Sequence, residues 1–222
     1  MNKLCQLLVL CACSGPIEAA LLDEQFDSGF PGGFVVTSGS ASVSGGLLHM
    51  NSACIQLPGT YSRGQNLAIE ARVRIGNASY GDFNVHGLYD TNPVCVTIPT
   101  NGYFTGWYPS GSDNPQDLID VGVGGVGSRI ADTPSSVVAG QWYILREEFL
   151  ADGKIKTYIN GINTMTVVNS THVSGRLGLR SWFDVDVDWV AVSTEIPEPS
   201  SFAMIVLGGC LFRALRQSRQ AQ

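Results

Sequence analysis

Residues 140–161, with the sequence GQWYILREEFLADGKIKTYING, carry the strongest fold signal in this chain of 222 residues. Two runs of alternating apolar and polar residues are separated by an Ala-Asp-Gly turn, and the second run ends at Asn160-Gly161. Such alternation is typical of a half-buried β-strand. Asn-Gly is a strong hairpin signal because both residues accept a positive φ. The stretch therefore predicts three antiparallel strands, the last over residues 164–168.

The same alternation recurs through the rest of the body. Residues 66–75 separate apolar from charged side chains, with Leu67, Ile69, Ala71, Val73 and Ile75 on one face and Glu70, Arg72 and Arg74 on the other. Shorter strands are predicted at residues 21–26, 34–37, 46–50, 54–57, 83–89, 94–98, 103–108, 118–123 and 128–131. The 26 glycines and the lack of helical spacing favour an all-β domain.

Three motifs in this order resemble those of laminin G-like and concanavalin A-like domains. The first hairpin of such domains is matched by FDSGF and SVSGGLLHM within residues 26–50. The Gly-x-Trp strand and Asn-Gly turn are matched by residues 140–161, and the closing strands by GRLGLRSWFDVDVDWVAV at residues 175–192. The resemblance implies an all-β, two-sheet antiparallel jelly-roll sandwich over residues 20–195.

The N-terminus has the form of a secretory signal peptide. Lys3 is followed by the apolar run LCQLLVLCAC and by small residues, so we expect residues 1–19 to be removed after Ala19. An alternative interpretation is a lipoprotein signal, because Leu-Cys-Ala-Cys at residues 10–13 resembles a lipobox and would place a lipid on Cys13.

Residues 196–222 resemble the PEP-CTERM sorting signal of exported bacterial proteins. A Pro-Glu-Pro motif is followed by an apolar stretch and a basic end, which comprise Pro197, Glu198, Pro199, residues 202–212, Arg213, Arg216 and Arg219. The resemblance implies a short transmembrane helix that holds the chain transiently in the inner membrane, and an exosortase-type enzyme that processes it. We therefore expect delivery to the cell surface or extracellular matrix. The alternative is an ordinary terminal anchor or an amphipathic end.

Charge narrows the class of partner. The chain has a net charge of −6, and removal of the two ends makes the body more acidic. An acidic surface disfavours nucleic acid and anionic membranes. It is compatible with neutral glycans and with cations.

The body of the chain contains two cysteines, Cys54 and Cys95, while the other four lie in the two end segments. In an oxidising exterior, such a pair favours one disulfide. The alternative is that both are buried, unpaired thiols.

An aromatic and acidic cluster is the first candidate ligand site. It comprises Tyr103, Trp107, Tyr108, Asp113, Asn114, Asp117 and Asp120. Ring faces stack on the CH groups of a sugar, while carboxylates and amides bind its hydroxyls. The alternative is a core strand that leads into a solvated turn. Trp182 and Trp189 are weaker candidate platforms because a strand tryptophan is more often core, and Trp142 is expected to serve packing.

Three aspartates at alternate positions, Asp184, Asp186 and Asp188, are the candidate metal ligands. They share one face of a predicted strand and could contribute to a Ca²⁺ site at the rim of a sheet. An EF-hand is excluded because Trp189 occupies the position that needs glycine. The alternative is an edge strand charged against self-pairing.

Catalytic motifs are poorly represented. The Glu-x-Asp-x-x-Glu string of jelly-roll glucanases does not occur, and the adjacent Glu147 and Glu148 point to opposite faces. His49, His86 and His172 are far apart in sequence, and Gly-x-Ser-x-Gly does not occur. We therefore interpret the chain as a non-catalytic module that binds an extracellular polysaccharide. The alternatives are a glycan-cleaving enzyme of the same superfamily and a purely structural matrix protein.

Overall fold

The computed structural model describes residues 20–194, except residues 77, 78, 80, 91–100 and 113. Within these limits the chain forms strands and one short 3₁₀ turn, η1 (Arg63–Gln65), and no helix is long and apolar enough to cross a membrane. The predicted signal peptide, the sorting tail and the strand predicted at residues 94–98 lie outside the described residues. These assignments stay predictions.

The strands follow one another along the chain. They are β1 (Ala20–Glu24), β2 (Val35–Ser44), β3 (Leu47–Gln56), β4 (Tyr61–Ser62), β5 (Leu67–Ile75), β6 (Phe83–Tyr89), β7 (Gly102–Trp107), β8 (Gln116–Val123), β9 (Val126–Pro134), β10 (Trp142–Phe149), β11 (Lys154–Ile159), β12 (Ile162–Val168), β13 (Ser174–Ser181) and β14 (Val185–Ser193). The predicted all-β class is therefore confirmed.

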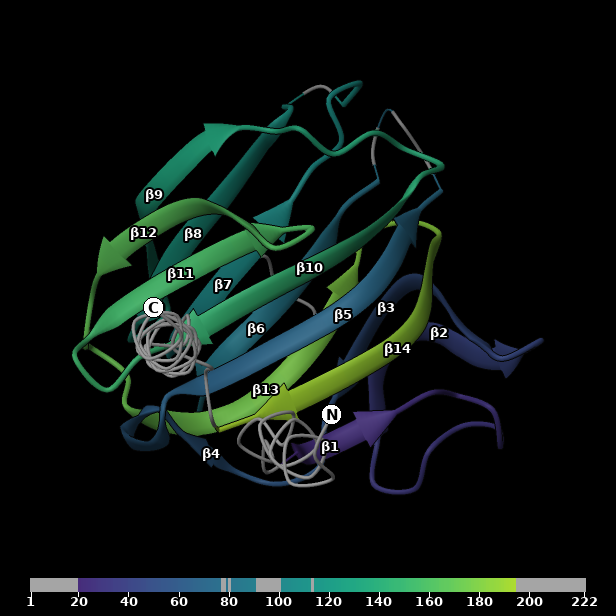
Figure 1. Cartoon of the computed structure of the whole chain (residues 1–222), viewed down its shortest axis with the longest axis horizontal. Coiled ribbons are helices and arrows are strands. Elements are labelled where there is room, and N and C mark those ends of the chain that lie inside the picture. Colours follow the sequence, from purple (N-terminus) through teal and green to yellow (C-terminus); the bar gives the residue numbers. More distant parts are fainter. Residues whose placement is uncertain (1–19, 77–78, 80, 91–100, 113, 195–222) are drawn as a thin grey trace, which may run out of the picture. The chain divides into compact units, whose positions relative to one another are not determined.

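The strands form an antiparallel jelly-roll sandwich of two layers (Figure 1). The first sheet has the order β12-β11-β10-β5-β14, and β1 pairs with β14. The second sheet has the order β13-β6-β7-β8-β9, and β4 pairs with β13. Strand β3 pairs with β14 of the first sheet and with β13 of the second, so it joins the two layers.

The crossing of β3 depends on a bend in the β2–β3 hairpin. Residues 48–50 of β3 pair with β14, and residues 54–56 pair with β13. Between them Ser52 has a φ of 45°, and Gly39 on the facing strand has a φ of 71°. A β-carbon on Gly39 would lie 1.9 Å from the carbonyl oxygen of Ser52. The bend therefore requires glycine at this position.

The hydrophobic core lies between the inner faces of the sheets. The apolar residues of β5, from Leu67 to Ile75, are at most 1% exposed, as the alternation predicts. Phe149 of β10 packs against Gly87 of β6, where a β-carbon would lie 2.2 Å from the phenyl ring. This contact brings the two sheets together at a site where only glycine fits.

Two predicted strand boundaries are wrong. The Ser/Gly-rich residues between the strands predicted at 34–37 and 46–50 belong mostly to β2, and the strands predicted at residues 46–50 and 54–57 are one strand, β3. Serine and glycine have low strand propensity, so pairing with β3 decides the conformation of β2. The hairpin turns at Gly45 and Gly46, both with positive φ.

Cys54 is a buried residue of β3 and forms a disulfide in the structure. Its predicted partner, Cys95, lies outside the described residues. The pairing of these two cysteines stays a prediction.

A carboxyl group lies inside the core. Glu147 of β10 is 0% exposed, its Oε1 accepts a hydrogen bond from the hydroxyl of Thr105, and its Oε2 has no partner among the described residues. Burial raises the pKa of Glu147 to about 8, while Thr105 and Arg63 act in the opposite direction. Glu147 is therefore neutral in the fold at pH 7.

Replacing Gly39 by alanine should destabilise the fold by more than about 2 kcal/mol, because the new methyl group overlaps the Ser52 carbonyl. Gly45→Ala is the matched control, since Gly45 also has a positive φ but a β-carbon added there would have nothing within 4 Å. We expect it to cost about 1 kcal/mol from backbone strain alone. Chemical denaturation measures both values, and equal losses would contradict the role of the bend.

The buried carboxyl group should make stability fall as the pH rises. Between the ordinary pKa of about 4.5 and the folded value of about 8, the unfolded chain releases the Glu147 proton while the fold retains it. The free energy of unfolding should therefore decrease over this range, and Glu147→Gln should flatten the decrease. Denaturation at pH 5 and pH 8 tests this expectation. Glu148→Gln, on the opposite face of β10, is the control, and in this variant the free energy of unfolding should still decrease with pH as it does in the unaltered chain.

Candidate functional site

Two of the predicted ligand-binding aromatic residues lie in the core. Tyr103 and Trp107 of β7 are both 0% exposed. The Trp107 ring stacks on Phe83 with 6.2 Å between the ring centroids, and the Tyr103 hydroxyl donates to the side chain of Asn169. Neither ring face can contact a sugar, so the structure corrects the sugar-stacking hypothesis for these two residues.

The remaining members of that cluster are divided between the two faces of the second sheet. Asp117 is buried on the same face of β8 as the core residue Ile119, and burial raises the pKa of Asp117 to about 7. Tyr108 is half-buried, and Asp120 pairs with Arg129 of β9. Asn114 is exposed, and Asp113 lies outside the described residues. The structure therefore does not assemble the predicted cluster into one site.

The three candidate calcium ligands bond to other side chains. Asp186 accepts from Nε and Nη2 of Arg74 at 3.0 and 2.6 Å, Asp188 pairs with Arg72, and Asp184 accepts from Asn51. The described residues contain no group of three side chains arranged to hold a metal ion. Strand β14 lies between β5 and β3, so the edge-strand alternative is wrong. Asp186 and Asp188 neutralise Arg74 and Arg72 of the neighbouring strand β5, while Asp184 bonds to Asn51.

Trp142 lies beside the same arginines. The guanidinium carbons of Arg72 and Arg74 are 4.8 and 5.0 Å from the centroid of its ring. Cation–π contact of this kind stabilises a half-buried aromatic ring at a sheet surface. Trp142 thus has a packing role, as the sequence predicts.

The outer face of the second sheet carries a polar row that sequence reasoning missed. We call it the Arg180 cluster, and it comprises Asp82, Asn84, His86, Arg180 and Trp182. Arg180 of β13 lies opposite Asn84 of β6 in the strand register. Asp82 lies just before β6, and its Oδ2 is 3.5 Å from Nη1 of Arg180 while its Oδ1 accepts from the backbone amide of Trp182 at 2.6 Å.

Burial governs the charges of this cluster. It lowers the pKa of His86 to about 3, with Arg180 adding to the effect, so His86 is neutral at physiological pH. Burial raises the pKa of Asp82, and Arg180 opposes that shift. The cluster therefore presents a neutral imidazole beside an ion pair.

Several polar atoms of the cluster have no hydrogen-bond partner among the described residues. They are Oδ1 of Asn84, Nε2 of His86 and Nε of Arg180, and all three side chains are at most 2% exposed. An unpartnered buried polar atom costs about 1–3 kcal/mol, so proteins rarely keep one without a function or a bound water. The three atoms are as inaccessible as the rings of Tyr103 and Trp107, so a ligand on this face would contact Trp182 and not these atoms.

Small residues make room for the polar row. Gly106 of β7 lies opposite Asn84, and a β-carbon there would lie 2.6 Å from both Asn84 Oδ1 and the Tyr108 ring. Gly106, in the sequence Phe-Thr-Gly-Trp at residues 104–107, is the feature of the sequence that could have pointed to the Arg180 cluster. It is recognisable only once the register of β6 and β7 is known.

Trp182 is the exposed aromatic residue of this face. Its side chain is 51% exposed, and the guanidinium carbon of Arg180 lies 4.9 Å from the ring centroid. On sequence alone Trp182 is a weaker candidate platform, because a tryptophan in a strand is more often core. It lies instead just after the end of β13, where the inward and outward alternation no longer applies.

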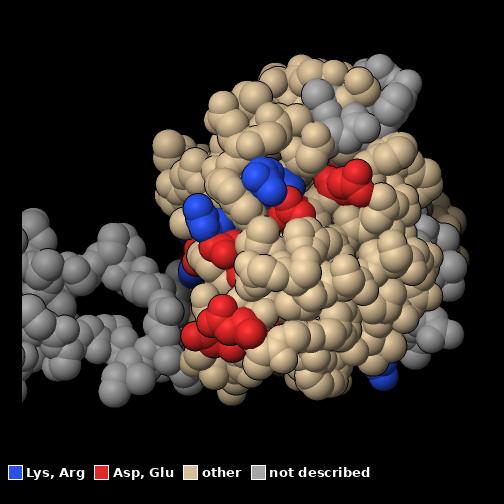
Figure 2. Space-filling model, turned by 90° about the vertical axis from the view of Figure 1, so that its right-hand side faces the viewer, with Lys and Arg blue, Asp and Glu red and all other residues tan. Residues whose placement is uncertain are grey.

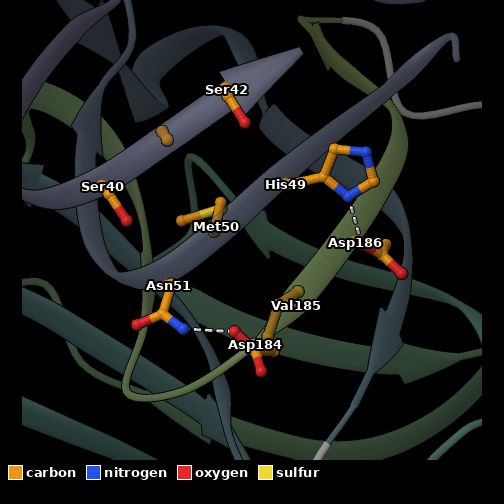
Figure 3. A pocket seen from close by; sticks show the side chains of 9 residues that line it. Ser40, Ser42, His49, Met50, Asn51, Asp184, Val185 and Asp186 are labelled. Atoms are coloured by element: carbon orange, nitrogen blue, oxygen red, sulfur yellow. Dashed lines mark hydrogen bonds and ion pairs between the residues drawn. The ribbon is translucent and has the colours of Figure 1, made fainter. Parts of the chain in front are cut away.

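A second polar surface lies over β2, β3 and β14. It is a hollow of about 260 Å³ lined by Ser40, Ala41, Ser42, His49, Met50, Asn51, Asp184, Val185 and Asp186. His49 and Asp186 face each other at one end, Asn51 and Asp184 meet at the other, and the apolar side chains lie between (Figure 3). Viewed from the side on which β2 lies in Figure 1, basic and acidic side chains adjoin one another on an otherwise uncharged face (Figure 2).

No family model and no curated protein matches the sequence. Solved structures do match its fold. The carbohydrate recognition domain of Emp47p is 12% identical, with a TM-score of 0.64 over 80% of this chain and 95% of that domain. Carbohydrate-binding module CBM66 from Bacillus subtilis is 16% identical, with a TM-score of 0.57 over 71% and 91%. A β-glucanase from Bacillus licheniformis is 13% identical, with a TM-score of 0.61 over 80% and 98%.

These similarities establish the class of fold. The chain is a jelly-roll sandwich of the type found in carbohydrate-binding modules, lectin-like domains and glucanases. At such identities the fold alone is shared, so the site must be argued from its own residues.

The two tryptophans should respond in opposite ways to truncation. Trp107→Ala should lower the free energy of unfolding by about 3–5 kcal/mol, because it leaves a cavity beside Phe83. Trp182→Ala should cost less than about 1 kcal/mol, because half of its surface is already exposed. Urea denaturation of both variants measures the difference, and similar losses would show that the assignment of core and surface is wrong.

Proposed function

We propose that the chain is an exported carbohydrate-binding protein, and that its ligand is an extracellular polysaccharide bound at the outer face of the second sheet. The observation that carries this proposal is the exposed ring of Trp182, which the guanidinium group of Arg180 supports from beneath at 4.9 Å from the ring centroid. An aromatic face stacks on the CH groups of a sugar ring, while polar atoms bind its hydroxyls. The similarity to carbohydrate-binding modules and lectin-like domains supports the same class of ligand.

Binding, and not cleavage, is the role proposed for this face. Glycoside hydrolysis uses a pair of carboxyl groups that flank the scissile bond. On this face Asp82 is paired with Arg180 and Asp120 with Arg129, so neither is free to act as a nucleophile or an acid among the described residues. Measurement of reducing ends after incubation with polysaccharide distinguishes a binder from an enzyme.

The proposed delivery of the protein rests on its two ends. The signal-peptide pattern of residues 1–19 supports export, and the Pro-Glu-Pro motif with its apolar and basic parts supports sorting by an exosortase-type enzyme. In this proposal the C-terminal segment holds the chain in the inner membrane until it is processed. The working location is then the cell surface or the extracellular matrix.

Removal of the Trp182 ring should abolish retention in a native gel that contains a neutral polysaccharide, because the stacking surface is lost. The Trp182→Ala variant should migrate as it does without polysaccharide, whereas the unaltered chain should be retarded. A series of β-glucans, mannans and bacterial exopolysaccharides serves as the set of probes.

Trp142→Ala is the matched control, since Trp142 is a half-buried tryptophan of the first sheet with similar contacts to arginine. It should keep the retardation of the unaltered chain. Retardation that survives in Trp182→Ala, or is lost equally in Trp142→Ala, would contradict the proposed binding face.

A further inference from the structure

The end of the β2–β3 hairpin brings a serine, a histidine and an aspartate into one hydrogen-bonded row. Ser44 is the last residue of β2, and its Oγ lies 2.9 Å from Nε2 of His49. Nδ1 of His49 lies 2.7 Å from Oδ1 of Asp186 on β14. A hydroxyl bonded to an imidazole, whose other nitrogen is bonded to a carboxylate, is the arrangement that activates a serine nucleophile.

Arg74 orients this row. It donates two hydrogen bonds to Oδ2 of Asp186, which leaves Oδ1 to accept from Nδ1–H of His49. A proton on Nδ1 makes Nε2 an acceptor for the hydroxyl of Ser44. The competing arrangement places the proton on Nε2, which then donates to the Ser44 carbonyl oxygen 3.2 Å away and makes His49 a structural clamp.

The serine lies where a substrate can approach it. Ser44 and Gly45 are exposed, and the turn residues Gly45 and Gly46 have φ values of 59° and 75°. Their amide N–H groups donate to no described group. Backbone amides that directly follow a nucleophile can stabilise the oxyanion of an acyl-transfer intermediate.

The hollow that His49 also lines suits the alcohol part of a substrate. Ser40, Ser42, Asn51 and Asp184 offer hydroxyl, amide and carboxylate groups around it (Figure 3). Alternate residues of a strand are about 7 Å apart. A hydroxyl-rich group seated beside Ser42 would therefore place an ester that it carries at Ser44.

We propose that Ser44 and His49, positioned by Asp186 and Arg74, form an esterase site for short carboxylic esters of hydroxyl-rich alcohols, such as an O-acetylated saccharide. The Ser44 Oγ forms a bond to the ester carbonyl carbon, and its proton passes to Nε2 of His49. The bond from that carbon to the alcohol oxygen then breaks, and the alcohol takes the proton. Water cleaves the acyl-serine in the same way, which releases the carboxylic acid and restores Ser44.

The site is separate from the Arg180 cluster, so it can be tested without reference to polysaccharide binding. The full chain is incubated with a fluorophosphonate, which labels only activated serines, and the modified peptide is identified by mass spectrometry. Labelling is expected at Ser44 and should be lost in His49→Gln. Acetate release from an O-acetylated xylo-oligosaccharide should fall by about 10²-fold or more in Ser44→Ala and His49→Gln.

Asp186→Asn separates positioning from binding, since it should lower kcat and leave KM nearly unchanged. Ser128→Ala is the control, because Ser128 is an exposed serine of β9 in the second sheet, on a different sheet from His49 and Asp186. Thermal melting verifies that each variant is folded. Absence of the Ser44 adduct in the unaltered chain, or its persistence in His49→Gln, would overturn the proposal and assign His49 to the structural clamp.

Discussion

The contact of Gly39 with Ser52 is the constraint on which the sandwich depends. It bends the β2–β3 hairpin so that one end of β3 completes the first sheet and the other end completes the second. The same bend sets the positions of both candidate surfaces. His49 lies on one side of it, facing Asp186, and Cys54 lies on the other, opposite Arg180.

The ion pairs of the two sheets differ in how far water reaches them. The outer face of the first sheet pairs arginines with aspartates between neighbouring strands, at positions that water partly reaches. In the second sheet Arg180 and Asp82 are almost inaccessible, although Arg129 is partly exposed. Trp182 is the exposed member of the Arg180 cluster, which is why this face, and not the more conspicuous row of aspartates, is proposed for ligand binding.

Local pattern predicted the strands well, because alternation reports which face of a strand is buried. It predicted the class of fold, the hairpin at Asn160 and the inward face of β5. It did not predict register, and both candidate surfaces depend on register. Asp186 and His49 are 137 residues apart, and no local pattern relates them. The sequence ranked Trp107 above Trp182 as a sugar platform, because a strand sequence does not show which tryptophan lies within the sandwich and which lies just beyond its end.

The hydroxyl of Ser52 donates a hydrogen bond to the carbonyl oxygen of Trp182, which ties the bend in β3 to the segment that follows β13. Strand β13 is itself held on both sides, by β3 and by β6. If a long polymer bound at the indole of Trp182 were pulled, the force would therefore act on an interior strand of the second sheet. Its hydrogen bonds to both neighbouring strands would have to slide past one another before the strand could separate. An attachment point of this kind resists mechanical peeling better than one on an edge strand.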